Sequence, residues 1–374
     1  MSGTEDGDPS RPVRPSGRTE EEVLDAIEKR RRRPHVKLMD KQITLAHGAG
    51  GKSSHVLVEM VFLKAFDNPV LDGLGDAAVL SAPAGTRLAF TTDASVVKPR
   101  FFPGGDIGEL AVNGTVNDLA MAGARPLWLT ASFILEEGLD TDELTTIAES
   151  MGAAAKRAGV AIVAGDTKVV ERGKADGVFI TTAGVGALER EIELSAAAVR
   201  PGDKVIVSGS IGDHGMAIMI ARGDLELETD LRSDTAPVHE LAAALLDATG
   251  EVRWLRDPTR GGVATVLAEL ALAAELGVVL DEAALPIKDE VNGACEILGI
   301  DPLYVANEGK LVAVVGPDGV DDAIAALRSH PLGAEAAVIG EVRAEPPGMV
   351  LLDTAFGGSR VVDMLAGDPL PRIC

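Results

Sequence analysis

A cysteine, Cys374, closes this chain of 374 residues and is one of only two cysteines in it. It follows the tail Gly367-Asp-Pro-Leu-Pro-Arg-Ile. A thiol at the end of such a tail can enter a pocket and leave it again, which is what a covalent carrier must do. The alternative interpretation is a frayed end without function, because chain termini tolerate change. Prenylation does not fit, since it needs a cysteine four residues from the end.

Aspartates at the ends of predicted segments could do a second kind of chemistry. Mg²⁺ prefers oxygen ligands and holds nucleotide phosphates through one or two carboxylates and water. Carboxylates that come from several different elements therefore favour a site for a nucleotide and its metal ion. The candidates are Asp76, Asp93, Asp118 and Asp166.

A line of polar residues lies on a helix predicted over residues 106–123. Glu109, Asn113 and Asn117 recur at i, i+4 and i+8, so they share one face of an otherwise largely apolar segment. A buried polar group without a partner costs about 1–3 kcal/mol. A bound ligand could supply the partners, or the line could face water, and the residues alone leave both interpretations open.

Glycine-rich segments could contact phosphates. Ala46-His-Gly-Ala-Gly-Gly-Lys-Ser53 is close to a P-loop, but its first glycine is replaced by Ala46 and no strongly hydrophobic strand precedes it. We therefore reject a P-loop and keep a loop whose N–H groups contact phosphates, with a flexible linker as the alternative. Residues 209–215 and 257–262 each open a predicted helix, where N–H groups favour anions. Together they indicate a cleft between domains, and His214 within the first of them is left without a role.

The elements that must position these residues alternate between strand and helix from about residue 40. In the first half we predict strands over residues 87–92, 127–135, 160–164 and 178–185, and helices over residues 107–123 and 141–159. In the second half we predict strands over residues 204–208, 278–281, 311–315 and 337–342, and helices over residues 213–222, 236–248, 261–276 and 320–329. The break over residues 189–202 predicts a boundary between two domains.

Composition excludes several classes of function. The net charge of −23 disfavours nonspecific binding of nucleic acid, which needs clustered Lys and Arg. We find no run of 18 apolar residues and no apolar N-terminal region, so we expect neither a membrane span nor a signal peptide. Two cysteines without C-x-x-C spacing suit a reducing cytoplasm. The first 18 residues are expected to be disordered, and a short helix is predicted before the arginine run at residues 30–33.

The sequence resembles the HypE family of hydrogenase maturation proteins from about residue 40 to the C-terminus. The similar motifs are Ile43-Thr-Leu-Ala-His-Gly-Ala-Gly-Gly51, Phe102-Pro-Gly-Gly-Asp-Ile-Gly108, Gly114-Thr-Val-Asn-Asp-Leu-Ala-Met121, Gly165-Asp-Thr-Lys-Val-Val170, Asp257-Pro-Thr-Arg-Gly-Gly262, Asn307-Glu-Gly-Lys310 and Pro371-Arg-Ile-Cys374. Several long motifs in the right order make this resemblance specific.

The resemblance implies an α/β (α+β) fold of two domains with mixed sheets and packed helices, like that of aminoimidazole ribonucleotide synthetase. It implies an ATP-binding domain over residues 37–190 that pairs into a homodimer, a C-terminal α/β domain over residues 191–366, and a mobile tail over residues 367–374. ATP would bind at the junction of the dimer and the domains. Residues 1–36, a disordered or short-helix extension, are not part of the family pattern.

The reaction that the resemblance implies is an ATP-dependent dehydration of a carboxamide on the Cys374 sulfur to a thiocyanate, which supplies the cyanide ligand of NiFe hydrogenase. Two N–H protons must leave, and the implied bases are Glu308 and Lys168. Glu308 would accept a proton as it stands, whereas Lys168 would need a lowered pKa or would act through its charge.

The resemblance also implies the ligands of ATP and Mg²⁺. The metal would be held by Asp76, Asp93, Asp118 and Asp166. The nucleotide would be held by His47, Gly48, Gly50, Gly51, Asp93, Asn117, Asp118 and Asp166. The implied partners are the carbamoyltransferase HypF and the HypC–HypD iron scaffold complex.

Two rival interpretations come from other classes. One is another ATP-using enzyme of the same superfamily, of the selenophosphate synthetase, thiamine-phosphate kinase or formylglycinamidine cyclo-ligase type. Such an enzyme acts on a small molecule and does not need Cys374. The other is a noncatalytic scaffold, which would not need the aspartates.

Overall fold

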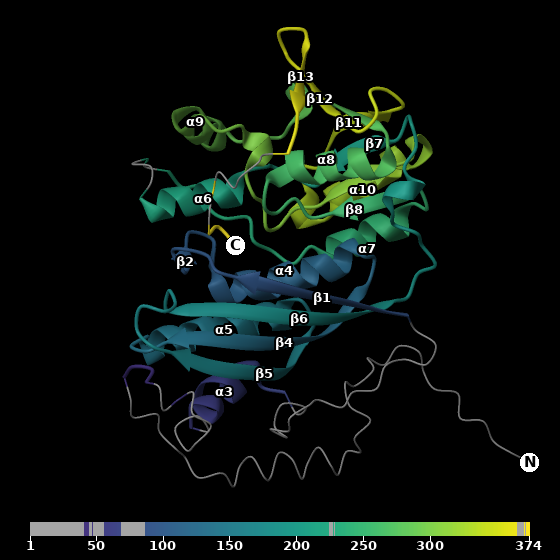
Figure 1. The fold of residues 1–374 in the computed structure, drawn as a ribbon. Helices are drawn as coiled ribbons and strands as arrows, with labels where there is room; N and C mark the ends of the chain where they lie inside the picture. The colour runs from purple at the N-terminus through teal and green to yellow at the C-terminus, as the bar shows by residue number, and fades with distance from the viewer. Residues whose placement is uncertain are drawn as a thin grey trace, which may run out of the picture.

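Two β-sheets, each with its own helices, make up the part of the chain that the computed structural model describes (Figure 1). That part comprises residues 41–44, 47, 56–68, 87–223, 227, 229–364, 370 and 372–374. One sheet has four strands and the other has seven, and a short ribbon of β2 (Phe101–Phe102) and β3 (Gly105–Asp106) accompanies them. Mixed sheets with packed helices confirm the expected fold class.

The first sheet has the strand order β1-β6-β4-β5. Its strands are β1 (Arg87–Ser95), β4 (Arg125–Glu136), β5 (Ala161–Val170) and β6 (Val178–Leu188). Strand β6 is antiparallel to both of its neighbours, whereas β4 and β5 are parallel. A parallel pair needs a long crossover, and helix α5 (Thr141–Arg157) supplies it. Helices α5 and α4 (Ile107–Met121) pack together on one face of the sheet, and η2 (Val58–Phe62) and α3 (Leu63–Phe66) pack against α5.

The other face of the first sheet is open to solvent among the described residues. Side chains alternate between the two faces of a strand, and the outward ones include Phe90, 72% exposed, and Ile134, 42% exposed. Register places Asp166 of β5 opposite Ser132 of β4, in the row that ends at Ala94 of β1. This row fixes which face each candidate site residue occupies.

The second sheet has the order β13-β12-β9-β11-β7-β10-β8, and only the β9–β12 pair is parallel. Its strands are β7 (Lys204–Val207), β8 (Val252–Arg256), β9 (Gly277–Asp281), β10 (Val312–Val315), β11 (Ala337–Arg343), β12 (Val350–Asp353) and β13 (Ser359–Val362). Its helices are α6 (Asp213–Arg222), α7 (His239–Ala248), α8 (Gly262–Ala274), α9 (Asp289–Leu298) and α10 (Val320–Ser329).

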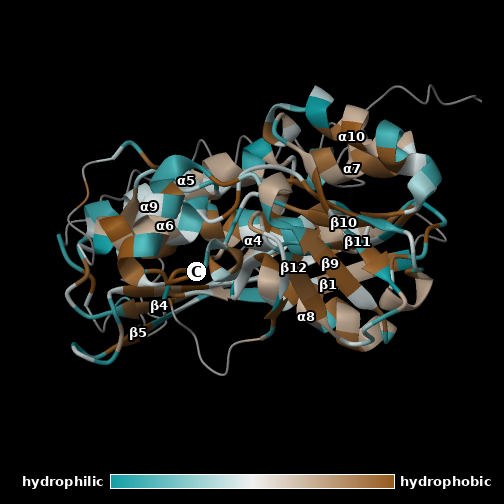
Figure 2. Ribbon diagram, turned by 90° about the horizontal axis from the view of Figure 1, so that it is seen from above, coloured by the Kyte–Doolittle hydropathy of each residue, from teal (hydrophilic) through white to brown (hydrophobic). Residues whose placement is uncertain are grey.

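Both faces of the second sheet are covered. Every residue of β10 is buried, because Val312 and Val314 pack toward α8 while Ala313 and Val315 pack toward α7 and α10. A strand buried on both faces is apolar throughout. Figure 2 shows strands β9, β10 and β11 in the brown of apolar residues.

Helix α4 joins the two halves of the molecule. It packs against β1 and β6 on one side and against α7 on the other, so it is apolar nearly all round (Figure 1). Its N-terminus is capped by Asp106, whose Oδ1 accepts the N–H of Gly108 at 2.7 Å. Within the residues described, no helix combines the length and the apolar character needed to cross a bilayer. The apolar surface of α4 is buried in protein instead.

The predicted segments agree with the observed ones except at a few places. All eight predicted strands and the six helices predicted after residue 100 are present, with ends that differ by up to three residues except in β5, which runs six residues beyond its predicted end. Strands β8, β12 and β13 were not predicted, because each is short and carries charged residues that break the apolar pattern. The helix predicted before the arginine run lies outside the described residues. The first sheet ends at Leu188 and the second begins at Lys204, and the exact domain limits stay predictions.

Candidate functional site

Four carboxyl groups from both halves of the molecule meet where α4 contacts the second domain. They are Asp93 of β1, Asp118 of α4, Asp257 after β8 and Glu308 before β10. Thr91 donates a hydrogen bond from Oγ1 to Oδ2 of Asp118 at 2.8 Å. A Cβ atom on Gly114 would lie 2.6 Å from Oδ2 of Asp93, so glycine at this position lets the Asp93 carboxylate lie directly on α4.

Burial and mutual repulsion raise the pKa values in this acidic cluster. Asp257 is 8% exposed, and burial, followed by the charge of Asp118, raises its pKa to about 7. Burial raises the pKa of Glu308 well above its usual range, with further contributions from Asp93, Asp257, Asp234 and Asp118. Like charges and a low local dielectric both disfavour the ionised form. The arrangement therefore suits a cation that would relieve the repulsion.

The cluster is not a preformed metal centre. Among the described residues, no three His, Cys, Asp or Glu side chains converge in a geometry that could hold an ion. Asp93 and Asp118 can still offer oxygens, which fits Mg²⁺ because that ion keeps water and nucleotide phosphates among its ligands. The buried Glu308 Oε1, which has no hydrogen-bond partner among the described residues, also points to a missing positive or donor group.

The backbone of Glu308 is held from both halves of the molecule. Its N–H donates a hydrogen bond to Oδ1 of Asp234 at 3.0 Å, and its carbonyl oxygen accepts one from Nδ2 of Asn117 at 3.0 Å. The next residue must be glycine, because a Cβ on Gly309 would lie 1.8 Å from the carbonyl oxygen of Asp234. Asn307 donates to the Pro258 carbonyl at 2.9 Å and accepts the N–H of Gly212 at 2.7 Å, so it ties the two helix-opening loops together.

Two members of the polar line on α4, Asn113 and Asn117, are buried against the second domain. Asn117 is 1% exposed, and its amide bonds the backbone at Ala236, Val238 and Glu308. Asn113 is fully buried and donates to Oγ1 of Thr235 at 3.1 Å. The second domain thus supplies partners for Asn117 and for the amide nitrogen of Asn113, whereas Oδ1 of Asn113 has no hydrogen-bond partner among the described residues and Glu109 pairs with Arg157 of α5. A contact of Asn117 with a nucleotide stays a prediction.

Asp166 and Lys168 lie away from the acidic cluster. Both are on β5 with side chains about two-thirds exposed, and Lys168 Nζ lies 2.9 Å from Oδ1 of Asp166. Three strand spacings of about 4.8 Å separate β5 from β1, and Asp166 points to the open face while Asp93 points to α4. Within one chain these residues cannot share an ion with Asp93, so the structure does not bring the predicted metal set together.

The C-terminal residues are seated against the first domain. Val96, just beyond β1, donates its N–H to a terminal oxygen of Cys374 at 3.0 Å, and Lys98 donates to the Arg372 carbonyl at 3.1 Å. Ile373 is 2% exposed within the core, and Cys374 packs against that core. Figure 1 shows the C-terminus between α6 and α4. The tail thus reaches the edge strand that carries Asp93.

The remaining predicted residues are only partly described. Asp76, Gly48, Gly50 and Gly51 lie outside the described residues. His47 is 2% exposed, and its Nδ1 accepts the N–H of Thr44 at 3.0 Å. Its contact with phosphates stays a prediction.

Sequence reasoning missed Asp234, left His214 without a role, and named Lys310 and Asp257 only as members of motifs. Asp234 forms a buried ion pair with Lys310, 3.1 Å from its Nζ, and His214 contacts the tail at Ile373 and lies near Asp234. No local pattern marks Asp234, because its partners are about 75 residues away. Asp257 lay in a recognised motif, where an acidic residue opening a helix loop could have been assigned to the site.

Comparisons with known proteins agree with this architecture. The family model described as AIR synthase related protein, N-terminal domain, matches residues 74–188, and the one described as AIR synthase related protein, C-terminal domain, matches residues 200–352. The carbamoyl dehydratase HypE of Rhizobium leguminosarum bv. viciae is 57% identical over 334 residues, which are 89% of this chain and 95% of that protein.

Two solved structures are similar over most of their length. The hydrogenase maturation protein HypE in complex with ATP matches with a TM-score of 0.85 at 47% identity, covering 88% of this chain and 99% of that one. A chain of the HypE–HypF complex matches with a TM-score of 0.72 at 49% identity, covering 83% of this chain and 99% of that one.

Proposed function

The chain belongs to the HypE family of carbamoyl dehydratases, and we propose that it uses ATP to dehydrate a carboxamide carried on the Cys374 sulfur to a thiocyanate, the source of a cyanide ligand for NiFe hydrogenase. One observation carries this proposal. Cys374 is seated beside Val96, three residues or about 10 Å along the strand direction from Asp93 of the acidic cluster. A similar protein is known in complex with ATP.

Only one of the two thiols can serve as the carrier. Cys295 is 2% exposed in α9, and burial raises the pKa of its thiol to about 12. A thiol reacts as its thiolate, so Cys295 is inert at neutral pH. Cys374 lies partly exposed at the end of the chain.

The proposed reaction balances without an oxidant or reductant. The carboxamide oxygen takes the γ-phosphoryl group of ATP, and ADP leaves. The C–O bond then breaks, the oxygen departs in inorganic phosphate, and the two N–H protons are removed as the C≡N bond forms. The product has therefore lost the elements of one water.

Glu308 is the candidate base within the chain, but its carboxyl needs help. Burial and the neighbouring carboxylates hold its pKa well above the usual range, which disfavours the ionised form that a base needs. A nearby positive charge would lower that pKa and make the carboxylate a base. Mg²⁺ supplies such a charge when bound with ATP, and Asp93 and Asp118 would hold it.

Lys168 can supply a second positive charge only from another subunit. Two copies that pack through their open sheet faces would bury Phe90 and Ile134. A two-fold axis along the strands puts β1 of one subunit over β5 of its partner. The partner subunit's Asp166 and Lys168 would then lie at the edge that carries Asp93 and Cys374. We propose this homodimer. An axis across the strands would instead place β5 over the partner's β5, far from the edge that carries Asp93.

Mixed dimers test the shared site. Subunits with Lys168→Ala and subunits with Glu308→Gln should each be inactive alone. After subunit exchange at equal amounts, half of the dimers are mixed and one of their two sites is intact, so about a quarter of wild-type activity should return. If exchange is complete and no activity returns, Lys168 and Glu308 do not act across the interface.

Intact-protein mass spectrometry tests the reaction itself. The chain is incubated with a HypF-type carbamoyltransferase, carbamoyl phosphate and ATP, and then supplied with Mg²⁺ and ATP. We expect one carboxamide adduct on Cys374 that later loses one water, with the same result for Cys295→Ser and no adduct for Cys374→Ala. An unmodified tail with ATP consumed on a small molecule would instead place the chain among the other enzymes of this fold.

The remaining parts of the proposal concern partners and compartment. A solved HypE–HypF complex supports a HypF-type protein as the carbamoyl donor. We further propose that a HypC–HypD scaffold receives the cyanide. A cytoplasmic location fits, because the reducing conditions there keep the Cys374 thiol reduced.

A further inference from the structure

A buried histidine contacts the last peptide bond of the chain. His214 of α6 is fully buried, and its Nε2 lies 2.5 Å from the carbonyl oxygen of Ile373. Its other nitrogen, Nδ1, lies 2.8 Å from Oγ of Ser233. The Ile373 carbonyl belongs to the peptide bond whose nitrogen is that of Cys374. One hydrogen bond therefore fixes the orientation of the peptide that carries the reactive residue.

The neighbouring groups define which nitrogen of His214 carries the proton. A carbonyl oxygen can only accept, so Nε2 must donate to Ile373. Nδ1 is then an acceptor, and Ser233 donates its hydroxyl proton to it while accepting the N–H of Thr235 at 3.1 Å. The neutral ring satisfies this whole chain of bonds. Burial lowers the pKa of His214 and so favours the neutral ring as well.

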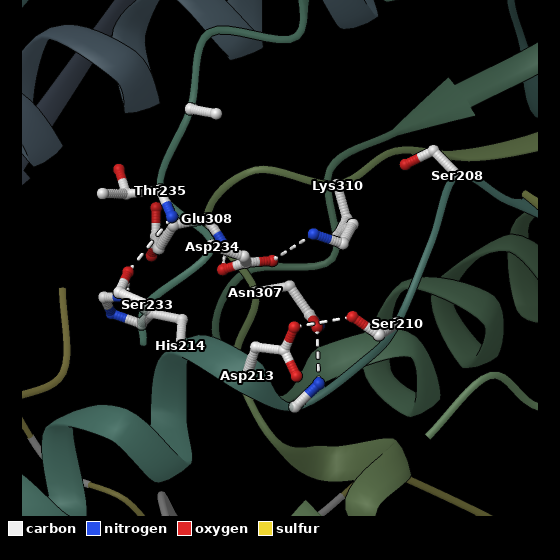
Figure 3. Close-up of polar contacts among 12 residues, drawn as sticks. Ser208, Ser210, Asp213, His214, Ser233, Asp234, Thr235, Asn307, Glu308 and Lys310 are labelled. Carbon is white, nitrogen blue, oxygen red and sulfur yellow. Dashed lines mark hydrogen bonds and ion pairs between the residues drawn. The ribbon is translucent and has the colours of Figure 1, made fainter. Parts of the chain in front are cut away.

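The same segment leads to the candidate base. Asp234 follows Ser233 directly and accepts the N–H of Glu308 at 3.0 Å. Figure 3 shows His214, Ser233, Asp234 and Glu308 in one group. The segment Ser233–Thr235 thus holds the histidine that seats the tail on one side and the backbone of Glu308 on the other.

We propose that His214 is a positioning residue for the dehydration step: it seats the peptide between Ile373 and Cys374 so that the modified sulfur is held at the acidic cluster. The proposal deepens the proposed function and rests on it. The other tail contacts lie nearer the surface, where Arg222 donates to the Arg372 carbonyl at 3.0 Å and Val96 bonds the chain end. His214, in contrast, is fully buried, so it holds the tail from inside the protein.

Two substitutions separate the two bonds of the ring. In His214→Gln the amide nitrogen can reach roughly the position of Nε2 and still donate to the Ile373 carbonyl. In His214→Asn the shorter amide stays near Nδ1 and Ser233 but cannot reach Ile373. The Asn variant thus removes the contact with the tail and serves beside the Gln variant as a matched pair.

The seat is measured first without any reaction, by the rate at which iodoacetamide alkylates Cys374 in the unmodified protein. Loss of one hydrogen bond should make His214→Asn react about tenfold faster, while His214→Gln stays within about threefold of wild type. Cys295 must remain unalkylated in both, which shows that the fold is intact. Equal alkylation rates in all three proteins would show that His214 does not hold the tail in place.

The dehydration rate is measured second, in single turnover after the tail has been carbamoylated. We expect carbamoylation to proceed in every variant, dehydration to slow about tenfold in His214→Asn, and His214→Gln to recover most of the rate. Faster alkylation with an unchanged dehydration rate would show that the seat has no part in the reaction. If the wild-type adduct never loses water, the proposed function fails, and the alkylation rates still decide whether His214 seats the tail.

Discussion

Different surroundings give individual carboxyl groups of this protein opposite acid–base properties. Asp257, at the junction of the domains, has a pKa raised to about 7 by burial and by Asp118. Asp166, exposed on β5, has its pKa lowered chiefly by the hydrogen bond from Lys168. The same residue type is therefore poised near neutrality at one position and permanently ionised at the other. Only the first can couple folding to pH in the physiological range.

The stability of the metal-free protein should fall as pH rises from 5 to 8, in part because of Asp257. Its pKa is higher in the folded chain than the usual 3.8. The folded state therefore binds more protons than the unfolded state between about pH 4 and 7, and stability drops by up to about 1.4 kcal/mol per pH unit there. We expect Asp257→Asn to remove much of this slope in urea unfolding curves measured in EDTA.

Asp166→Asn is the matched control for this prediction. Its pKa is already lowered, so the variant should keep the wild-type slope between pH 5 and 8. Equal slopes for Asp257→Asn and wild type would show that the carboxyl of Asp257 is ionised throughout that range.

Helix α4 is the element that holds the site together. It carries Asp118 and the glycine under Asp93, and through Asn117 it bonds three backbone groups of the second domain. A helix in this place contacts protein on all sides, which explains why its apolar residues do not form a single stripe. The polar side chains on it act as fixed connections between domains.

Asn117→Ala should destabilise the fold strongly, by roughly 2–4 kcal/mol, because it leaves two carbonyls and one N–H buried without partners. Asn113→Ala removes one hydrogen bond, to Thr235, and should cost about 1 kcal/mol. Thermal unfolding of the two variants side by side gives the comparison. A smaller loss for Asn117→Ala than for Asn113→Ala would contradict the connecting role.

In the molecule as a whole, one face of the first sheet is open to solvent among the described residues. The first sheet is covered by α4 and α5 on one face, while the outward residues of the other face include the exposed Phe90 and Ile134. Large apolar side chains exposed on an open sheet face are typical of an interaction site. The same face carries Asp166 and Lys168, so catalysis and assembly would depend on the same contact.

Phe90→Lys should therefore separate the dimer into monomers and abolish dehydration, because it places a charge within the proposed interface. Sedimentation of the variant gives its mass, and the water-loss reaction gives its activity. Phe356→Lys is the control, since Phe356 lies fully exposed on the hairpin between β12 and β13, away from that face. A Phe90→Lys protein that stayed dimeric would place the interface elsewhere.

Local patterns in the sequence determined the elements. Apolar patterning located β1, β4 and β6 as strands and α5 as a helix. The acidic residues Asp93 and Asp118 were also identified there, as was the terminal thiol, whereas Glu308 came only from the resemblance to the HypE family. These features depend on neighbours within a few positions, so a single sequence contains them.

Only the tertiary structure decided which of these residues meet. Asp93 and Asp166 lie on opposite faces of one sheet because of a register that runs through two intervening strands. The bond from His214 to Ile373 joins residues 159 positions apart, as no local periodicity could foresee. The type and spacing of side chains can be read from the sequence. Which elements face one another depends on how the whole core packs.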